Sequence, residues 1–314
     1  MEKRRLGQSG IHTAPLCLGG NVFGWTLDEA GSCRILDEFV AAGFDFIDTA
    51  DVYSTWVPGH VGGESETIIG NWFRQRGNRS KVILATKVGW QMPDGKGLSR
   101  AHIMRAVEDS LRRLQTDYID LYQSHVDDAD TPLEETLGAF AELIRQGKVR
   151  AIGASNYDAV RLTQALDLAQ RDGLPRYDSL QPLYNLYDRS GYEGELGPLC
   201  VARGVGAISY FSLASGFLTG KYRSQQDLTG RARGPRVEKY LNPRGMAILK
   251  ALDEVAAAHA STPASVALAW LMGRPGVVAP IASATNSAQL SALVAAGNLK
   301  LDAASLQALE AASA

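Results

Sequence analysis

The sequence alternates eight short β-rich runs with longer segments that have the apolar spacing of amphipathic helices. Strands that alternate strictly with helices pair in parallel, because each helix returns the chain to the same edge of the sheet. Eight units of roughly 30 to 40 residues fit a closed (β/α)8 barrel better than a six-stranded doubly wound sheet, which is the alternative. The predicted strands are 15–20, 44–48, 82–87, 118–125, 149–155, 179–181, 206–210 and 277–282.

Two stretches depart from this alternation. Residues 1–14 predict a short N-terminal β-hairpin, and residues 217–243 form a long Gly- and Arg-rich connection without clear periodicity. A long loop after a barrel strand usually lies over the active face. Near the end of the chain we expect extra helices. No linker or internal repeat divides residues 1–314, so we expect a single domain.

Capping residues are expected at several helix ends. In "TPLE", Thr131 is predicted to cap a helix, with Pro132 in its first turn and Glu134 at the capping-box position. Glycines are predicted to end three helices, at Gly43, Gly147 and Gly173.

Charge and composition restrict the partners of the chain. The 32 basic and 34 acidic residues give a net charge of -2 with no long run of either sign, so neither nucleic acid nor anionic lipid is indicated. Without an apolar stretch of about 18 residues or a signal-like start, we expect no membrane span and a cytoplasmic location. Three widely separated cysteines predict neither a disulfide framework nor a metal site. A small molecule is the expected partner.

Four reactive side chains follow predicted strands. Asp48 ends one strand with Tyr53 just beyond it, Lys87 ends the next, and His125 ends the one after that. The carboxyl ends of barrel strands meet at one mouth, so these groups are expected to converge. There Asp48 would hold Lys87, and Lys87 would lower the pKa of Tyr53, while His125 would orient a carbonyl or relay a proton at low pH. Such a group protonates an oxygen as it becomes an alkoxide, and the matching hydride requires a nicotinamide cofactor.

Each residue also has an ordinary structural interpretation. An Asp after a strand is usually turn chemistry, a lone Tyr packs at the core edge, a Lys ends a strand in solvent, and a lone His is structural. The spacing of Asp48 and Tyr53 favours a site, whereas Asp51 keeps the turn interpretation.

The whole chain resembles the aldo-keto reductases. The resemblance rests on ordered motifs, among them "FDFIDTADVY", "GGESETIIGNWF", "ILATKVG", "DYIDLYQSH", "VRAIGASN" and "FSLASGFLTGKY". These are similar to the bacterial long-loop branch, which also resembles the potassium-channel β subunits. The resemblance implies a catalytic tetrad of the four residues above, with Tyr53 as general acid or base in NAD(P)H-dependent reduction of an aldehyde or ketone.

The resemblance also implies the residues that bind the nicotinamide half of the cofactor. Ser155, Asn156 and Gln181 would hydrogen-bond the carboxamide, and Tyr210 would stack on the ring. The backbone of Ser212, Leu213 and Ser215 would contact the pyrophosphate. Ser155 and Asn156 have an alternative role as caps of a helix that starts at Tyr157.

The adenine side departs from the family pattern. Where the family places "IPGA" and a basic residue for the 2'-phosphate, this chain has "IASATNSAQL". Neutral hydrogen bonds are expected from Ser283, Thr285, Asn286 and Gln289. A hydroxyl cannot bind phosphate bidentately as an arginine does. The missing cation would therefore be replaced by Arg231, Arg233 or Arg236. NADP(H) is favoured, and NAD(H) stays possible.

Aromatic residues near the predicted mouth suggest a substrate pocket made by Phe23, Trp25, Trp56 and Trp90, with packing as the alternative for each. They favour a hydrophobic, aromatic or sugar-derived carbonyl. The competing function is a nicotinamide-binding redox sensor or regulatory subunit with incidental turnover, and a hydrolase is a distant third. The sequence leaves the substrate, the physiological direction and the oligomeric state open.

Overall fold

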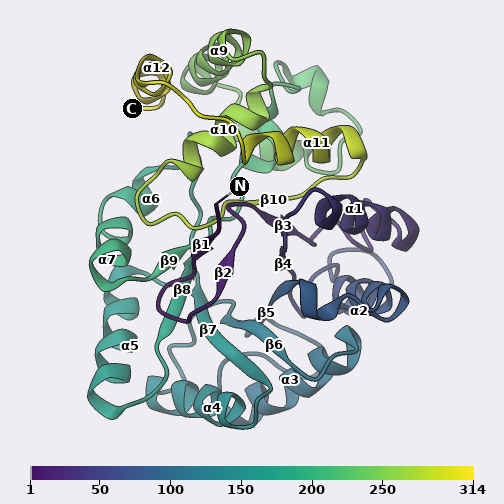
Figure 1. Cartoon of the computed structure of the whole chain (residues 1–314), viewed down its shortest axis with the longest axis vertical. Helices are drawn as coiled ribbons and strands as arrows, with labels where there is room; N and C mark the ends of the chain where they lie inside the picture. The colour runs from purple at the N-terminus through teal and green to yellow at the C-terminus, as the bar shows by residue number, and fades with distance from the viewer. Residues whose placement is uncertain (1) are drawn as a thin grey trace.

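A computed structural model describes residues 2–314, and its centre is a parallel barrel (Figure 1). The strands are ordered sequentially around the sheet, with the last strand beside the first, which excludes the doubly wound alternative. Residues before the last strand pair with β9 through Ala207 and Val277, and this closes the barrel. The strands are β3 (Cys17–Gly19), β4 (Phe46–Asp48), β5 (Ile83–Val88), β6 (Ile119–Ser124), β7 (Val149–Ser155), β8 (Tyr177–Gln181), β9 (Gly206–Ala207) and β10 (Ile281–Ala282). All eight predicted strands are confirmed.

The predicted hairpin is also confirmed, and it closes the N-terminal end of the barrel. Strands β1 (Arg4–Arg5) and β2 (His12–Thr13) pair antiparallel and cross in front of the barrel in Figure 1. Leu6, from the turn between them, packs on the buried inner cluster that includes Phe46 and Leu121. The barrel interior is therefore filled at this end, and only the opposite end can hold a ligand.

Helices cover the outside of the barrel, and the last four gather beyond β10 (Figure 1). On α3, Ile103, Val107, Leu111 and Leu114 form a buried apolar face, and the Ser99 side chain caps the helix by accepting a hydrogen bond from the His102 backbone amide. The helices are α1 (Glu29–Ala41), α2 (Glu64–Arg76), α3 (Arg100–Leu114), α4 (Leu133–Arg145), α5 (Ala159–Asp172), α6 (Ser190–Glu193), α7 (Leu196–Arg203), α8 (Gly234–Val237), α9 (Pro243–Ala258), α10 (Pro263–Met272), α11 (Ser287–Ala296) and α12 (Ala303–Ser313).

One predicted cap is wrong. Pro132 occupies the N-cap position of α4, and no side chain caps it. The Thr131 hydroxyl instead donates to Asp128, which also accepts from the Leu98 amide. A nearby acceptor in the preceding loop thus outcompetes the helix end for this hydroxyl.

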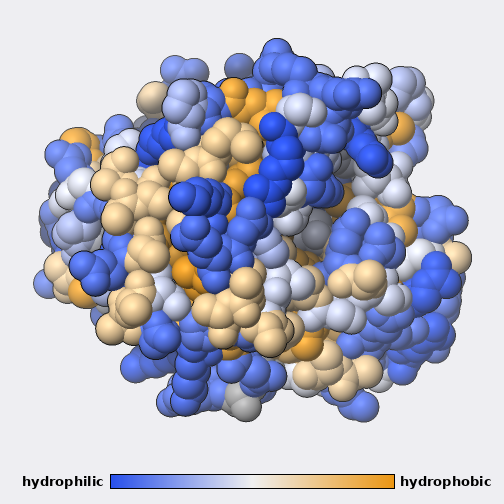
Figure 2. Space-filling model, turned by 90° about the horizontal axis from the view of Figure 1, so that it is seen from above, coloured by the Kyte–Doolittle hydropathy of each residue, from blue (hydrophilic) through white to orange (hydrophobic). Residues whose placement is uncertain are grey.

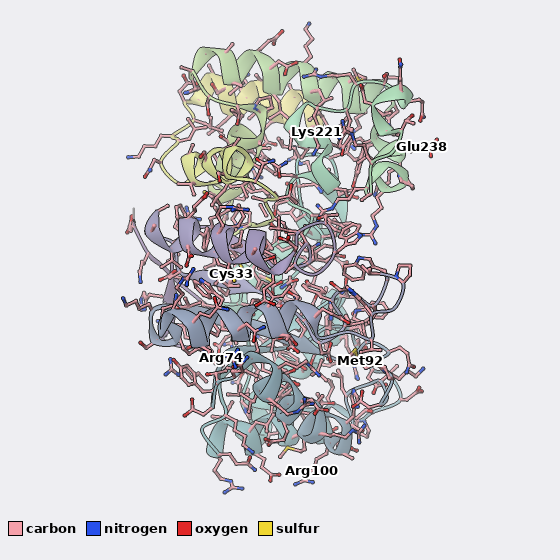
Figure 3. All side chains as sticks on the ribbon, turned by 90° about the vertical axis from the view of Figure 1, so that its right-hand side faces the viewer. Cys33, Arg74, Met92, Arg100, Lys221 and Glu238 are labelled. Carbon is pink, nitrogen blue, oxygen red and sulfur yellow. The ribbon has the colours of Figure 1, made fainter. Side chains whose placement is uncertain are left out.

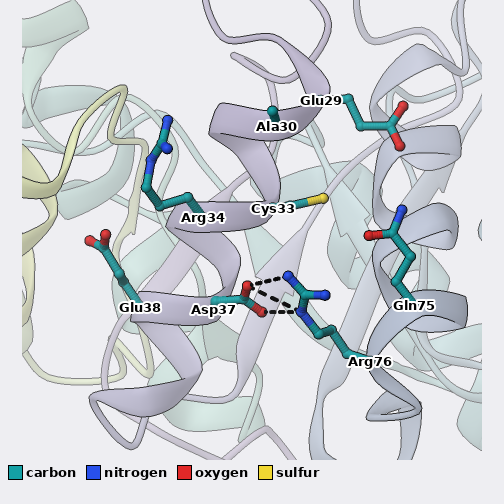
Figure 4. Close-up of a pocket in the computed structure, with 8 residues that line it drawn as sticks. All are labelled: Glu29, Ala30, Cys33, Arg34, Asp37, Glu38, Gln75 and Arg76. Atoms are coloured by element: carbon teal, nitrogen blue, oxygen red, sulfur yellow. Dashed lines mark hydrogen bonds and ion pairs between the residues drawn. The ribbon is translucent and has the colours of Figure 1, made fainter.

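A groove about 560 Å³ in volume lies between α1 and α2 on the outside of the barrel (Figure 4). Asp37 binds the Arg76 guanidinium with two oxygens and also accepts from the Trp72 indole. Cys33 lines this groove, and it is buried and free, as are Cys17 and Cys200, which confirms the absence of a disulfide framework.

The long connection after β9 folds into short helical turns. These are η2 (Ala214–Thr219), η3 (Gln225–Leu228), α8 and η4 (Glu238–Tyr240), whereas η1 (Arg79–Lys81) precedes β5. Figure 3 shows Lys221 and Glu238 of this connection in the upper part of the molecule, beside the C-terminal helices. Residues 230–233 and 236 line the large cavity at the barrel mouth. The expected position of this segment over one end of the barrel is confirmed.

The C-terminal helices are apolar because they pack on one another. Within residues 2–314, no single helix is both long and apolar enough to cross a membrane; α9 and α10 reach that length only together and meet at 94°. Residues 264–272 of α10 are all buried. The surface above these helices mixes hydrophilic residues with smaller apolar areas (Figure 2).

Candidate active site

Three of the predicted tetrad side chains meet in direct hydrogen bonds. The Lys87 ammonium donates to Asp48 Oδ2 at 2.6 Å, to the Tyr53 hydroxyl at 2.8 Å and to the Thr49 carbonyl at 2.7 Å. Lys87 and Asp48 are 0% and 1% exposed. A buried ammonium is tolerated here because a carboxylate and two further acceptors satisfy all three of its protons.

The barrel register brings these groups together. Asp48 is the last residue of β4 and pairs with Gly19 on one side and Ala85 on the other. Lys87 lies near the end of β5 and pairs with Gln123 of β6. His125 follows β6, and its backbone amide donates to the Val88 carbonyl at 2.8 Å. All of these positions are at the C-terminal end of the barrel.

The pKa of Tyr53 is shifted in the direction opposite to the one expected from the sequence. Burial, followed by the charge of Asp48, raises the pKa of Tyr53 well above its ordinary value. The expected lowering of this pKa by Lys87 is outweighed by burial and by the charge of Asp48. Tyr53 therefore carries its proton at neutral pH, as a general acid requires.

His125 is neutral at this site. Burial, followed by the charge of Lys87, lowers the pKa of His125 well below its ordinary value. Its ring lies 6.0 Å from those of Tyr53 and Trp90. The expected low-pH proton relay is not supported, but a neutral imidazole can still donate a hydrogen bond to a carbonyl oxygen.

The predicted nicotinamide-binding residues form one connected group. The side-chain Nδ2 of Asn156 donates to the His125 backbone carbonyl at 2.9 Å, and the Tyr210 hydroxyl donates to Asn156 Oδ1 at 3.0 Å. Ser155 donates to the Gln181 carbonyl at 3.0 Å. All four predicted residues, Ser155, Asn156, Gln181 and Tyr210, line the large cavity. The capping alternative is wrong, because Asp158 caps α5.

The "YFSLASG" segment has an unusual backbone. Phe211, Ala214 and Ser215 all have positive φ, and Leu213, just before this left-handed pair, has φ of −107°. Such conformations cost of order 1–3 kcal/mol each in non-glycine residues and cluster at functional sites. Successive amides in this arrangement form a concave nest for anions. The predicted Ser212, Leu213 and Ser215 all line the cavity here.

The four residues predicted near the adenine side differ in their positions. Ser283, Thr285 and Gln289 line the cavity. The Ser283 hydroxyl donates to the Gly19 carbonyl and to Asn21 Oδ1, and the Thr285 hydroxyl donates to the side-chain Oε1 of Gln289. Asn286 does not line the cavity, and its side chain caps α11 by accepting a hydrogen bond from the Gln289 backbone N–H. Its predicted contact with the cofactor is therefore not supported.

Four cations line the same cavity: Lys221, Arg231, Arg233 and Arg236. Within residues 2–314, none of them forms an ion pair with an acid. Partial burial, together with Arg233 and Arg231, lowers the pKa of Lys221. Cations that lie close together without acidic partners repel one another, and a bound anionic ligand would reduce this repulsion.

The aromatic residues at the mouth separate into two groups. Trp56 and Trp90 line the cavity and are 42% and 46% exposed. Trp25 packs edge-on against Trp56 at 5.7 Å between ring centroids. Phe23 is 0% exposed and packs in the outer core, so its predicted place in the substrate pocket is wrong.

Two buried polar residues near the tetrad were not identified from the sequence. Gln123 donates to Asp48 Oδ1 at 3.1 Å from inside β6. Strand alternation could have indicated it, because a Gln that faces the barrel interior must find polar partners. Asp51 lies in a turn, as predicted, but the sequence did not indicate that its side chain is buried and that, within residues 2–314, its Oδ1 has no hydrogen-bond partner.

The assembled site is a cavity of about 1100 Å³ with a buried Asp–Lys–Tyr group at its floor and cations at its wall.

Residues 15–314 match the model of the aldo/keto reductase family. The chain is 36% identical to an uncharacterized oxidoreductase, YrpG, from Bacillus subtilis, over 96% of this chain and 93% of that protein. It is 35% identical to a probable voltage-gated potassium channel subunit beta from Oryza sativa, over 92% and 89% of the two chains. It is 32% identical to the aldo-keto reductase YhdN of Bacillus subtilis, over 93% and 88%. The chain therefore belongs to the aldo/keto reductase family.

Proposed function

We propose that this protein reduces an aldehyde or ketone to an alcohol with NAD(P)H, in a reversible reaction. The observation that carries the proposal is the contact between the Tyr53 hydroxyl and the buried Lys87–Asp48 pair at the floor of the cavity. Bound NAD(P)H would supply the hydride to the carbonyl carbon. Tyr53 would donate its proton to the carbonyl oxygen, and the Lys87 ammonium would stabilise the phenolate that remains.

His125 would position the substrate. A neutral imidazole at the cavity wall can donate one hydrogen bond to the carbonyl oxygen without competing with Tyr53 for a proton. The Asn156 amide holds the His125 backbone, so the residues that would bind the nicotinamide also fix this imidazole. All of these groups come from one barrel, and we propose that residues 1–314 act as a single domain.

We favour NADP(H) as the cofactor, because four unpaired cations exceed what the pyrophosphate alone would neutralise. The strained backbone of residues 211–215 would hold the pyrophosphate, and Lys221 or the arginines of residues 231–236 would bind the 2'-phosphate. Parallel fluorescence titrations with NADPH and NADH test this preference. Tighter binding of NADPH supports it, and equal affinity or a preference for NADH contradicts it.

The aromatic wall favours a hydrophobic, aromatic or sugar-derived carbonyl substrate. Two half-exposed tryptophans, Trp90 beside His125 and Trp56 beside Tyr53, leave ring surface in the cavity that such a substrate would cover. Trp90→Ala should raise the KM for an aromatic aldehyde and leave that for a short aliphatic aldehyde nearly unchanged. A small-molecule substrate, a cytoplasmic location and no binding to nucleic acid or membrane complete the proposal.

The second candidate is a nicotinamide-binding redox sensor or regulatory subunit. The similarity to a probable potassium channel subunit beta favours it. A broad panel of carbonyl compounds with NADPH separates the two functions. Turnover supports the enzyme, whereas cofactor binding without turnover on any compound supports the sensor.

A further inference from the structure

Gln123 is a buried polar residue inside the barrel. Its side chain is 0% exposed and does not line the cavity, so it cannot contact a substrate. Its Nε2 donates to Asp48 Oδ1 at 3.1 Å, and its Oε1 accepts from Gln181 Nε2 at 3.3 Å. Strand β7 leaves room for the Gln123 side chain because its residue paired with Gln123 is Gly153, which has no side chain. A Cβ at Gly153 would lie only 3.2 Å from Gln123 Cγ.

The two oxygens of Asp48 have different partners. Oδ2 accepts from Lys87 and Tyr53, while Oδ1 accepts from Gln123 at 3.1 Å and from Gln181 at 3.0 Å. The two amides therefore fix the rotation of the carboxylate. Without Gln123, Oδ1 would keep only the Gln181 donor, and the carboxylate would rotate toward sharing Lys87 between both oxygens.

Gln181 joins this pair to the cavity. It lines the cavity and belongs to the group proposed to bind the nicotinamide carboxamide, and its Nε2 is directed inward to Asp48 and Gln123. Its Oε1 is left to accept from a ligand. The same amide plane thus connects the cofactor side of the site to the tetrad carboxylate.

We propose that Gln123 is a positioning residue for carbonyl reduction, which holds the Asp48 carboxylate so that Lys87 stays on the Tyr53 hydroxyl. The proposal rests on the proposed function. Donors on Oδ1 also spread the negative charge of Asp48, which weakens its hold on the Tyr53 proton. Gln123 would act on proton transfer and leave cofactor affinity unchanged.

Two substitutions separate positioning from packing. Gln123→Met keeps the side-chain length without the amide. Gln123→Glu keeps the shape, and its carboxyl donates to Asp48 only while it is protonated. Ser179→Ala is the matched control, since Ser179 is a buried interior residue whose hydroxyl has no hydrogen-bond partner. Thermal unfolding and NADPH titration check that each variant folds and binds cofactor.

The measurement is single-turnover hydride transfer across a range of pH. Gln123→Met should transfer roughly tenfold more slowly at every pH with NADPH affinity within about twofold of wild type, as expected for one lost hydrogen bond to a charged group. Gln123→Glu should transfer nearly as fast as wild type at low pH and lose rate as pH rises. Ser179→Ala should match wild type.

A crystal structure of cofactor-free Gln123→Met gives a readout independent of turnover. The Lys87 ammonium should move away from the Tyr53 hydroxyl, beyond hydrogen-bond distance. Wild-type rates in Gln123→Met, or an equal loss in both variants at every pH, would overturn the positioning role. Absence of transfer in the wild-type protein with every carbonyl would instead overturn the proposed function, and the crystal structure would still test the role of Gln123.

Discussion

Asp51 offers a test of the electrostatics around the tetrad that needs no substrate. Its carboxyl is 2% exposed, and its Oδ1 has no hydrogen-bond partner among the residues that the structure describes. The nearest cations are already paired, since Arg113 binds Glu66 at 2.6 Å and Lys87 binds Asp48 at 2.6 Å. Burial, followed by the charge of Glu66, raises the pKa of Asp51 well above its ordinary value. We therefore expect Asp51 to bind its proton more tightly in the folded protein than in the unfolded chain.

The sign of the effect on stability follows from this pKa. An unfolded aspartate ionises near pH 4, whereas the folded carboxyl stays neutral, so the folded state loses stability as pH rises from there toward the folded pKa. The loss is about 1.4 kcal/mol for each pH unit in that window. Asp51→Asn is neutral in both states and removes the loss. The free energy of unfolding of Asp51→Asn, relative to that of wild type, should therefore increase by about 1.4 kcal/mol for each pH unit in this window.

Thermal unfolding at pH 5, 6 and 7 measures this difference. For a chain of 314 residues, the melting temperature of Asp51→Asn should rise relative to wild type by about 2 °C per pH unit. Asp130→Asn is the control, because it removes the same charge from an exposed position. A variant that is destabilised equally at every pH would show that Asp51 is ionised and bound to a cation, and the reasoning would fail.

Three further predictions follow from the structure. Lys221→Ala should weaken NADPH binding roughly tenfold more than NADH binding, since a charge-assisted contact to the 2'-phosphate is lost; equal losses in parallel titrations would contradict this, and Lys239→Ala, whose lysine pairs with Asp188, serves as the control. Asp120→Ala should lower the free energy of unfolding by about 3 kcal/mol, because it leaves Arg79 without its carboxylate at a buried site, and a loss under about 1 kcal/mol in chemical denaturation would refute this. The single-turnover reduction rate should be flat between about pH 7 and 9.5, because the pKa of His125 is lowered and that of Tyr53 is raised, and a titration inside this window would contradict one of these two directions.

Much of the architecture could be predicted from the sequence. Strand and helix periodicity gave the barrel, because burial on both faces of a parallel strand leaves a continuous apolar run. The convergence of Asp48, Lys87 and His125 could be predicted as well, since each ends or follows such a run. Topology alone brings these strand ends to one mouth.

The sequence did not reveal which partner each polar group takes in space. Thr131 and Asn286 have similar capping signals, yet Thr131 bonds to Asp128 and Asn286 caps α11. Asp51 and Asp48 looked alike by position, and only the packing of α2 and α3 shows that the cation near Asp51 is already bound to Glu66. The raised pKa of Tyr53 depends in the same way on burial and on the pairing of Lys87 with Asp48.

The most direct test of the proposed chemistry is single-turnover hydride transfer by Tyr53→Phe with saturating NADPH and an aldehyde that the wild-type protein reduces. The substitution removes one hydroxyl from the Lys87 contact and leaves the cavity wall intact. We predict that transfer falls at least 100-fold, as expected when a general acid is lost, while NADPH affinity stays within about twofold of wild type. Transfer at the wild-type rate would contradict the assignment of Tyr53 as the proton donor.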